Sequence, residues 1–350
     1  MACSPNLTVY NVQLPFGASP SSTTEPVTIS TGDVDAIVDA FNSLLKHYGF
    51  EVHPFLVGWY NELCSPRLQL SGCPPDQLAL CIISTPEMFE RSFLPHIIEC
   101  LSCAPNLTAS YEQFNWPKHF SSQDHIDRSV YLRITHAVSV FSDRLDECHH
   151  LQGVIEQIKE CFWSPDYALQ PVTRMPLVHS SAAGHAAGVA YFHSPSEAVE
   201  VGVKESSEVT ALGVGTPHRL FGCSLHPYHG GWFGFRGVLM FPKVRCPDLP
   251  RKQPRSSLPP GTPPFDPVLV RNLLTEYTCH WRNQKWREFG LDTSDEASTV
   301  ASTSADGEEL PTQRYSLAAR IFFNTACNKR LQLLELWAKE GVPKFNLLQE

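Results

Sequence analysis

Two apolar runs on either side of a short turn constrain the fold more than any other feature of the sequence. Residues 220–225 and 232–241 are rich in apolar and aromatic side chains, and His226-Pro-Tyr-His-Gly-Gly231 lies between them. Two β-type runs joined by a glycine-containing turn are typical of a β-hairpin. The sequence therefore predicts antiparallel strand pairing in the middle of the chain.

Helices and further strands are expected on both sides of this hairpin. Apolar residues between 34 and 48 recur at helical spacing, and Gly49 supplies a C-terminal stop. The segment 184–191, GHAAGVAY, is small and apolar and is expected to pack its backbone closely against another element. Further predicted elements are strands at 50–52 and 78–83 and helices over 87–103, from about 129, over 151–161, after Asp266-Pro267 and over 315–337. Strands mixed with helices indicate an α+β fold.

One domain, residues 30–340, is expected to carry this fold. Residues 1–29 are rich in Ser, Thr and Pro and predict a disordered tail. Loops are expected at 104–127, at 243–265 and at 290–313. The second is proline-rich and predicts an extended connector, whereas the third is acidic, without Lys or Arg, and predicts a disordered loop insertion.

Charge and hydropathy exclude several classes of protein. The formal net charge of −9 argues against a surface for nucleic acid or for an anionic membrane, because both need a basic face. The longest purely apolar stretch, 78–83, is far shorter than the roughly 20 residues that span a bilayer. No signal peptide is visible in residues 1–30. We therefore expect a cytoplasmic protein whose 12 cysteines are reduced, with Cys100-x-x-Cys103 as a structural pair.

The usual nucleotide, protease and hydrolase motifs are missing. The sequence has no Gly-x-Gly-x-x-Gly after a strand, no P-loop, no His-Glu-x-x-His and no Gly-x-Ser-x-Gly. Five histidines gather within about fifty residues, but none shows helical His-x-x-x-His spacing. These are His179, His185, His193, His226 and His229. Ordinary surface or core histidines are the favoured interpretation, and no metal site is expected from protein side chains.

Three arginines in aromatic or apolar surroundings stand out against the acidic background. In the predicted strand from Trp232, alternation places Gly234 and Arg236 on one face and Phe233 and Phe235 on the other. Glycines beside aromatics suit a flat object laid against the backbone, although an ordinary strand whose arginine pairs with an acid is equally open. Arg282 and Arg330 lie in apolar helices. The three guanidinium groups either converge on a polyanionic small molecule or remain at the surface.

Several motifs in the same order resemble the cobalamin type C protein family. The motifs are Gly49-Phe-Glu-Val-His-Pro-Phe55, Trp59-Tyr-Asn-Glu-Leu63, Ser84-Thr-Pro-x-Met-Phe89, His185-Ala-Ala-Gly188, His226-Pro-x-x-Gly-Gly-Trp-Phe-x-x-Arg-Gly237, Pro247-Asp-Leu-Pro250, His280-Trp-Arg282 and Arg314-Tyr-Ser316. Together they cover roughly two-thirds of the chain. The resemblance implies a flavin nitroreductase-like sheet with packed helices.

The resemblance also implies a reaction. Cobalamin is held with its lower base detached, and its upper axial ligand is removed. Reduced flavin, FMN or FAD, drives the loss of cyanide, and glutathione takes up alkyl groups. A flavin reductase and a downstream cobalamin-trafficking adapter are the expected protein partners. A binding-only cobalamin chaperone and a flavin nitroreductase with other substrates remain the alternatives.

Carried over by position, the family's sites fall on two sets of residues. The cobalamin contacts are expected at Asp166, Val178, His179, Ser180, Ser181, His185, Gly188, Phe192, His193, Ser194, Ser224 and Phe235. The glutathione carboxylates are expected at Arg236, Arg282 and Arg330. No side chain is assigned as a catalytic group, because the cofactors carry the chemistry.

Overall fold

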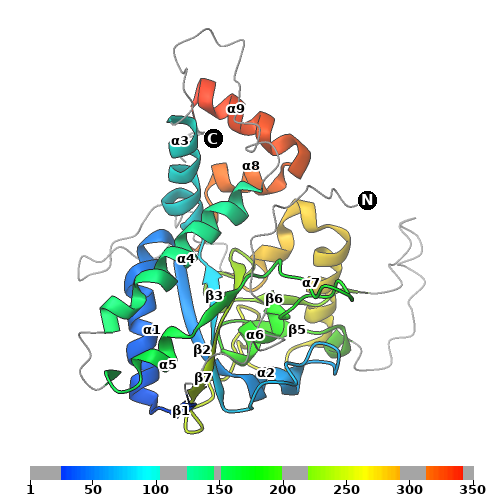
Figure 1. The fold of residues 1–350 in the computed structure, drawn as a ribbon. Helices are drawn as coiled ribbons and strands as arrows, with labels where there is room; N and C mark the ends of the chain where they lie inside the picture. Colours follow the sequence, from blue (N-terminus) through cyan, green and yellow to red (C-terminus); the bar gives the residue numbers. More distant parts are fainter. Residues whose placement is uncertain (1–24, 103–123, 146–150, 199–219, 292–312, 342–350) are drawn as a thin grey trace, which may run out of the picture.

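A mixed five-stranded sheet forms the centre of the protein in the computed structural model (Figure 1). The structure describes residues 25–102, 124–145, 151–198, 220–291 and 313–341. The strand order is β1 (Val27–Thr28), β7 (Gly234–Arg245), β3 (Gln77–Ser84) and β2 (Phe50–Leu56), and β4 (Phe162–Ser164) also pairs with β7. β7 runs antiparallel to β3 and β4 and parallel to β1. The predicted combination of helices with an antiparallel sheet is thus confirmed, with one parallel pair added.

The strand β3 lies between two hydrophobic cores, and all eight of its residues are therefore buried. Leu78, Leu80 and Ile82 pack into one core, whereas Ala79, Cys81 and Ile83 pack into the other. This alternation follows from the two-residue repeat of a strand. A strand that is apolar at every position therefore needs a covering layer on both faces, as the run 78–83 predicted.

The first face of the sheet is covered by α1 (Thr31–Leu45), α4 (His125–Leu145) and the short α5 (Ile155–Lys159) (Figure 1). A capping box starts α1: the Ser30 side chain accepts from the Asp33 backbone, and the Asp33 carboxylate accepts in return. Gly49, with φ of +79°, ends the following turn. A side chain there would place its Cβ 2.3 Å from the Met88 nitrogen, so only glycine fits.

The second face is covered by α2 (Val57–Leu63) and α6 (Ser180–Ala186). A separate two-stranded sheet, β5 (Tyr191–His193) with β6 (Cys223–Leu225), lies next to α6, and α7 (Pro267–Cys279) lies beyond it (Figure 1). A third hydrophobic cluster joins β6 and α7. Residues that are far apart in the sequence therefore meet around α6.

Three helices form a lobe at one end of the molecule (Figure 1). These are α3 (Leu94–Ser102), which follows a π-helical turn at Phe89–Phe93, with α8 (Leu317–Asn324) and α9 (Arg330–Glu340). Phe89, Phe93, Phe322 and Trp337 pack against one another in tilted and edge-to-face arrangements, at ring separations of 4.7–6.4 Å. The last predicted helix, 315–337, is thus two helices separated by the turn Cys327–Lys329.

The predicted hairpin between residues 220 and 241 is wrong. β6 pairs with β5 and β7 pairs with β3, so the two runs belong to different sheets. The glycines between them pack against the turn η7 (Lys285–Glu288). The Gly231 N–H donates to the Arg287 carbonyl at 2.9 Å, and a Cβ on Gly230 would lie 2.4 Å from that oxygen. Gly230 and Gly231 therefore leave the space in which the turn η7 packs.

Several predicted boundaries also shift. Residues 27–28 of the predicted tail form β1, and the predicted loop 104–127 ends in the first turn of α4. The expected connector 243–265 begins with the last residues of β7. The predicted strand 50–52 extends to Leu56 because Pro54 is tolerated in β2, which lies at the edge of the sheet. The acidic loop 290–313 lies almost entirely outside the described residues.

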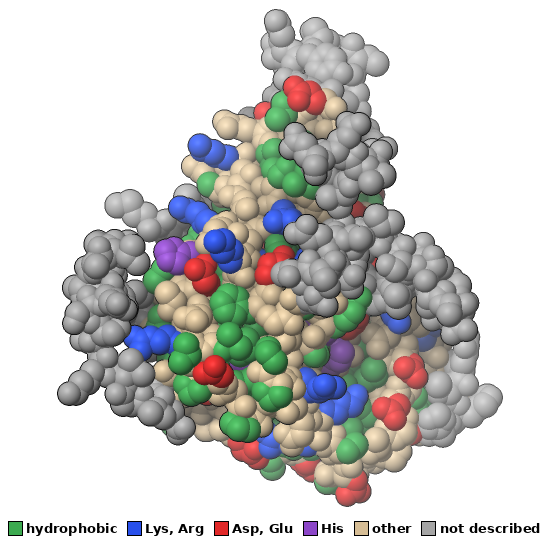
Figure 2. Space-filling model, turned by 180° about the vertical axis from the view of Figure 1, so that it is seen from behind, with side chains coloured by type: hydrophobic (Ala, Val, Ile, Leu, Met, Phe, Trp, Pro, Cys, Tyr) green, Lys and Arg blue, Asp and Glu red, His purple; other side chains and the backbone are tan. Residues whose placement is uncertain are grey.

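Acidic and basic side chains are interspersed over the surface seen in Figure 2, with apolar side chains between them. No helix among the described residues is long and apolar enough to cross a membrane.

Candidate functional site

Several of the residues expected to contact cobalamin lie around the N-terminus of α6 and on the neighbouring strands β5 and β6. His179 is the N-cap of this helix, and its Nδ1 accepts the Ala182 N–H at 3.2 Å. The His179 backbone N–H donates to the Tyr60 hydroxyl at 3.0 Å. Burial lowers the pKa of His179, which keeps the acceptor nitrogen unprotonated. Ser180 and Ser181 follow in the first turn and are half-buried.

Small residues let α6 approach the strand β7 closely. A Cβ on Gly184 would lie 2.3 Å from Cε1 of Phe235, so the Phe235 ring rests against the helix backbone. Phe233 supports this ring edge-to-face at 5.1 Å. The close backbone packing expected for 184–191 is confirmed at Gly184.

Three of the residues expected to contact cobalamin lie on the paired strands β5 and β6. Phe192 and Ser224 face the side of His179, and His193 faces the opposite side. Phe192 lies opposite Ser224 in the register, so both side chains point to the same face, and the Phe192 ring lies 5.8 Å from the His179 ring. The Ser224 Oγ is buried and has no hydrogen-bond partner among the described residues. His193 faces the other way and is fully buried, with its Nε2 2.8 Å from the Ser256 Oγ. The Ser194 N–H donates to Glu197 on the side of His193.

His185 and Gly188 connect this surface to its support. The His185 Nδ1 accepts the Phe192 N–H at 3.1 Å, and burial lowers its pKa to about 4, so the ring is neutral. Gly188 has φ of +71°, and a Cβ there would lie 2.7 Å from the side chain of Lys252 in the connector. These two residues thus hold α6 against β5 and against the proline-rich segment.

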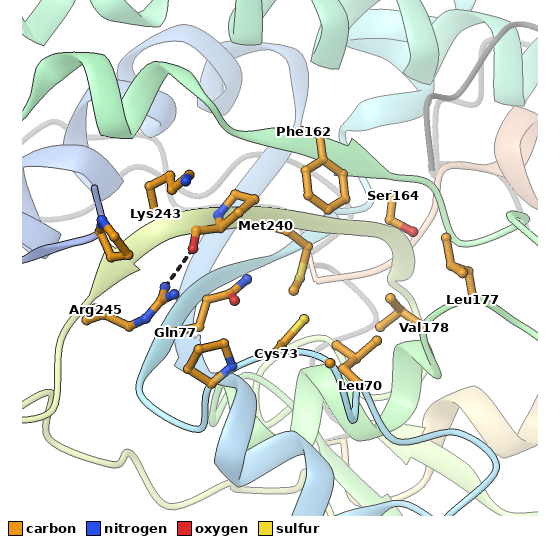
Figure 3. Close-up of a pocket in the computed structure, with 14 residues that line it drawn as sticks. Leu70, Cys73, Gln77, Phe162, Ser164, Leu177, Val178, Met240, Lys243 and Arg245 are labelled. Carbon is orange, nitrogen blue, oxygen red and sulfur yellow. Dashed lines mark hydrogen bonds between the residues drawn. The ribbon is translucent and has the colours of Figure 1, made fainter. Parts of the chain in front are cut away.

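A cavity of about 550 Å³ opens beside Val178, immediately before α6 (Figure 3). Its walls are mostly apolar and come from Leu70, Phe162, Leu177, Val178 and Met240, with Cys73 and Gln77 between them. Lys243 and Arg245 lie at the end away from Val178 (Figure 3). The Ser164 Oγ also lines the cavity and is buried without a hydrogen-bond partner among the described residues. Only Val178 was predicted, because the lining comes from segments scattered along the chain.

A charged cluster lies where α4, the end of β4, β7 and α9 meet. We call Asp124, Asp127, Asp166, Arg236 and Arg330 the acid–base cluster. Arg236 Nε donates to the Ser84 Oγ at 2.9 Å, and Arg330 lies 3.7 Å from Asp124 while donating to the Thr325 carbonyl at 3.2 Å. Burial raises the pKa of Asp166, and the Arg236 guanidinium opposes that rise. Asp166 thus interacts with Arg236 of the cluster.

Two of the three predicted arginines meet in this cluster. Arg282 is exposed in the turn η6 (Trp281–Asn283), where its guanidinium lies 5.0 Å from the centre of the Trp281 ring. Within the described ranges no contact joins Arg282 to Arg236 or Arg330. Arg236 and Arg330 thus act on the same carboxylate, Asp127, whereas Arg282 lies in a separate turn.

Asp124 and Asp127 were not predicted as site residues. Both fell in the range expected to be a loop, and neither belongs to a motif. Three-dimensional proximity to Arg330 is the signal that reveals them. The described part of the chain contains no group of three or more His, Cys, Asp or Glu side chains arranged to hold a metal ion. His226 Nδ1 instead accepts the Tyr228 and His229 N–H groups at 3.1 Å.

Comparisons with known proteins identify one family. The family model of the methylmalonic aciduria and homocystinuria type C family matches residues 49–304. A mouse protein named cyanocobalamin reductase / alkylcobalamin dealkylase is 30% identical over 293 residues, which are 83% of this chain and 78% of that protein. A Caenorhabditis elegans MMACHC-like protein is 29% identical and covers 89% of this chain and 96% of its own.

A solved structure is similar over nearly the whole fold. The crystal structure of the C. elegans B12-trafficking protein CblC, a homologue of human MMACHC, aligns with a TM-score of 0.63 at 26% sequence identity. The alignment covers 91% of this chain and 99% of that chain. The matched segment 49–304 contains β2, β3, α6, β5, β6 and β7, which together build the surface around α6. The chain belongs to the methylmalonic aciduria and homocystinuria type C family.

Proposed function

We propose that this protein binds cobalamin and removes its upper axial ligand, as the names of its relatives describe for them. Cyanide leaves after reduction of cobalt, and alkyl groups pass to the thiolate of glutathione. One observation carries the proposal: a surface of small and aromatic residues around α6 adjoins an apolar cavity with a cationic end. The corrin ring needs a surface to lie against, and the detached lower base needs an adjoining cavity.

The surface of His179, Phe192 and Ser224 is suited to the edge of the corrin ring. The corrin carries amide side chains, which need hydrogen-bond partners when they are buried. Ser224 offers a buried hydroxyl that no described residue satisfies, and Ser180 and Ser181 offer two more hydroxyls on the half-buried first turn of α6. We keep Phe192 rather than His193 in this surface, because His193 is fully buried against Ser256.

The cavity beside Val178 is suited to the detached lower base. A flat aromatic base fits against the apolar wall that the paired residues Phe162 and Met240 form, and its phosphodiester reaches toward Lys243 and Arg245. The buried Ser164 hydroxyl supplies a donor within the same space. Detachment of the base removes one donor from Co(III), which makes the metal easier to reduce.

Decyanation draws its electrons from outside the protein. Reduced FMN or FAD supplies them when bound, and we assign none of the described residues to it. The contribution of the chain is to hold cobalamin with the base detached and the upper face accessible. A flavin reductase and a trafficking adapter are the proposed protein partners. A reducing compartment such as the cytoplasm fits the described cysteines, all of which are free thiols.

Dealkylation needs a bound thiol. Glutathione carries two carboxylates, and guanidinium groups bind carboxylates through paired, charge-assisted hydrogen bonds. Arg236 uses its Nε on Ser84 and directs the rest of its guanidinium over Gly234, whose missing side chain makes the room. With Arg330 it provides two positive charges that also favour thiolate over thiol.

The test is product analysis with purified protein. Methylcobalamin with glutathione should yield S-methylglutathione, and cyanocobalamin with a reduced flavin should release cyanide. Tight cobalamin binding with neither product would identify a binding-only chaperone. Turnover of nitro compounds without any affinity for corrinoids would identify a flavin nitroreductase of other specificity.

A further inference from the structure

Asp127 differs from the other carboxylates of the acid–base cluster. Asp124 has two roles: its Oδ1 caps α4 by accepting the Ile126 N–H at 2.9 Å, and its Oδ2 lies 3.7 Å from Arg330. Asp166 has Arg236 as its main electrostatic support. The Asp127 carboxylate makes no hydrogen bond and no ion pair with any of the residues that the structure describes. It is therefore available to a bound molecule.

The surroundings of Asp127 set its protonation. Burial, followed by the charges of Asp124 and Asp166, raises its pKa to about 7, while Arg236 and Arg330 oppose this rise. The group is thus divided between carboxylate and carboxylic acid near neutral pH. A proton acceptor works best when its pKa lies near the working pH.

The proposed thiol site and this carboxylate share the same arginines. Arg236 and Arg330 are the two cations that act on Asp127, and they are also the two predicted glutathione arginines that lie together. Asp127 lies one helical turn after Asp124, and its N–H donates to Asp124 Oδ1 at 3.4 Å, while Asp124 Oδ2 is 3.7 Å from Arg330. A tripeptide held at Arg330 would therefore lie close to Asp127. A free thiol has a pKa of about 8.5, so it is mostly protonated at pH 7 and needs a base.

We propose that Asp127 accepts the thiol proton of glutathione bound at Arg236 and Arg330. This inference rests on the proposed function. The S–H proton passes to the Asp127 carboxylate, and the thiolate then attacks the alkyl carbon. A sulfur–carbon bond forms, the cobalt–carbon bond breaks, and its electron pair stays on cobalt, which is reduced from Co(III) to Co(I). Asp127 afterwards returns the proton to solvent.

The experiment compares Asp127→Asn with Asp143→Asn, which removes an exposed carboxylate from the other end of the same helix. Glutathione-dependent dealkylation of methylcobalamin is measured from pH 6 to pH 9.5 at saturating glutathione. We expect Asp127→Asn to lose about 100-fold at pH 7, in the range of general-base catalysis, and to recover to within about fivefold at pH 9.5 as the thiol ionises unaided. Asp143→Asn should follow the wild-type profile, and Asp127→Glu should restore part of the rate at pH 7.

Two outcomes would overturn the inference. A loss in Asp127→Asn that is equal at every pH would indicate a role in folding or binding, and an unchanged rate at pH 7 would exclude any role. The cobalamin absorbance spectrum of each variant shows whether the corrin site is intact. If the wild-type protein itself shows no dealkylation with glutathione, then the proposed function fails. If the wild type is active and only Asp127→Asn behaves differently from expectation, then this inference alone fails.

Discussion

The surface around α6 and the acid–base cluster both reach the start of β7, at the neighbouring residues Phe235 and Arg236, but they differ in chemistry. Around α6 the titratable groups are histidines with lowered pKa values, and two of them serve as fixed acceptors for backbone N–H groups. In the acid–base cluster the carboxylate pKa values of Asp127 and Asp166 are raised beside two arginines. The histidines around α6 therefore favour the neutral form and hold backbone N–H groups in place, whereas the carboxylates of the acid–base cluster favour taking up a proton. The proposed corrin surface and the proposed site of thiol activation are thus distinct in chemistry.

Gly184→Ala tests whether α6 forms part of the corrin site, and we expect this variant to have the largest effect. The new Cβ would collide with Phe235, so the aromatic ring must leave its place between α6 and Phe233. Cobalamin affinity should fall at least about 50-fold, and both reactions should fall with it. Gly153→Ala is the control, because a Cβ at Gly153 meets no atom within 4 Å. Affinity within twofold of wild type, in a folded Gly184→Ala protein, would remove α6 from the corrin site.

Arg330→Ala should separate the two reactions. Loss of a charge-assisted hydrogen bond costs about 1.5–3 kcal/mol, so glutathione-dependent dealkylation should fall by about tenfold or more. Decyanation should change by less than about threefold, because it uses no thiol. Arg282→Ala is the matched variant and should change dealkylation by less than about twofold, since Arg282 is exposed and outside the cluster. Equal losses in both arginine variants would show that Arg282 reaches the same ligand.

Lys243→Gln tests whether the cavity beside Val178 holds the detached lower base. If the cationic end holds the phosphodiester of the detached base, cobalamin should bind about five- to tenfold more weakly. Cobinamide, which lacks the lower base and its phosphodiester link to ribose, should bind the variant and the wild type equally well. Calorimetry with both ligands makes the measurement. A similar loss for cobinamide would mean that Lys243 acts on the corrin or on the fold.

Elements of the fold were predicted correctly from the sequence where the residues that determine them are close together in the chain. The helix α1, its Gly49 stop and the buried strand β3 were predicted correctly, because a helical repeat of apolar residues, a terminal glycine and a fully apolar run are each signals within a short stretch of sequence. The hairpin prediction failed because the partner of β6 is β5, some thirty residues earlier, beyond any turn signal. Strand pairing is a non-local property, and tertiary contacts override the local pattern.

The candidate site divides in the same way. The predicted contacts between 178 and 194 came from positions carried over from the family, whereas the cavity draws its lining from β3, β4, β7 and two loops. Asp127 has no sequence signal at all, because its properties come from the charges of Asp124, Asp166, Arg236 and Arg330 on four different segments. Side-chain electrostatics of this kind become visible only when the fold brings those segments together.

The smallest expected effect concerns stability in acid. Burial lowers the pKa of His226 to about 3 and that of His185 to about 4, so at these two positions the unfolded state binds more protons than the folded state below pH 6.5, an effect that the raised pKa of Asp127 offsets in part. Stability therefore falls as the pH drops from 6.5 toward 4, and the melting temperature should be lower at pH 5 than at pH 7 by a few degrees, roughly. His226→Asn retains an acceptor for the turn without titrating and should reduce this difference by about 2 °C. An unchanged difference would show that His226 is accessible to protons in the folded state.

Removal of the upper ligand from cobalamin with a detached base is the central claim, and the absorbance spectrum of bound methylcobalamin tests it most directly. The protein is titrated into methylcobalamin at neutral pH, and the band that reports coordination of the lower base is followed. We predict a complete shift to the base-off spectrum near one equivalent of protein, with formation of S-methylglutathione when glutathione is then added. A base-on spectrum that persists at saturating protein would contradict the account.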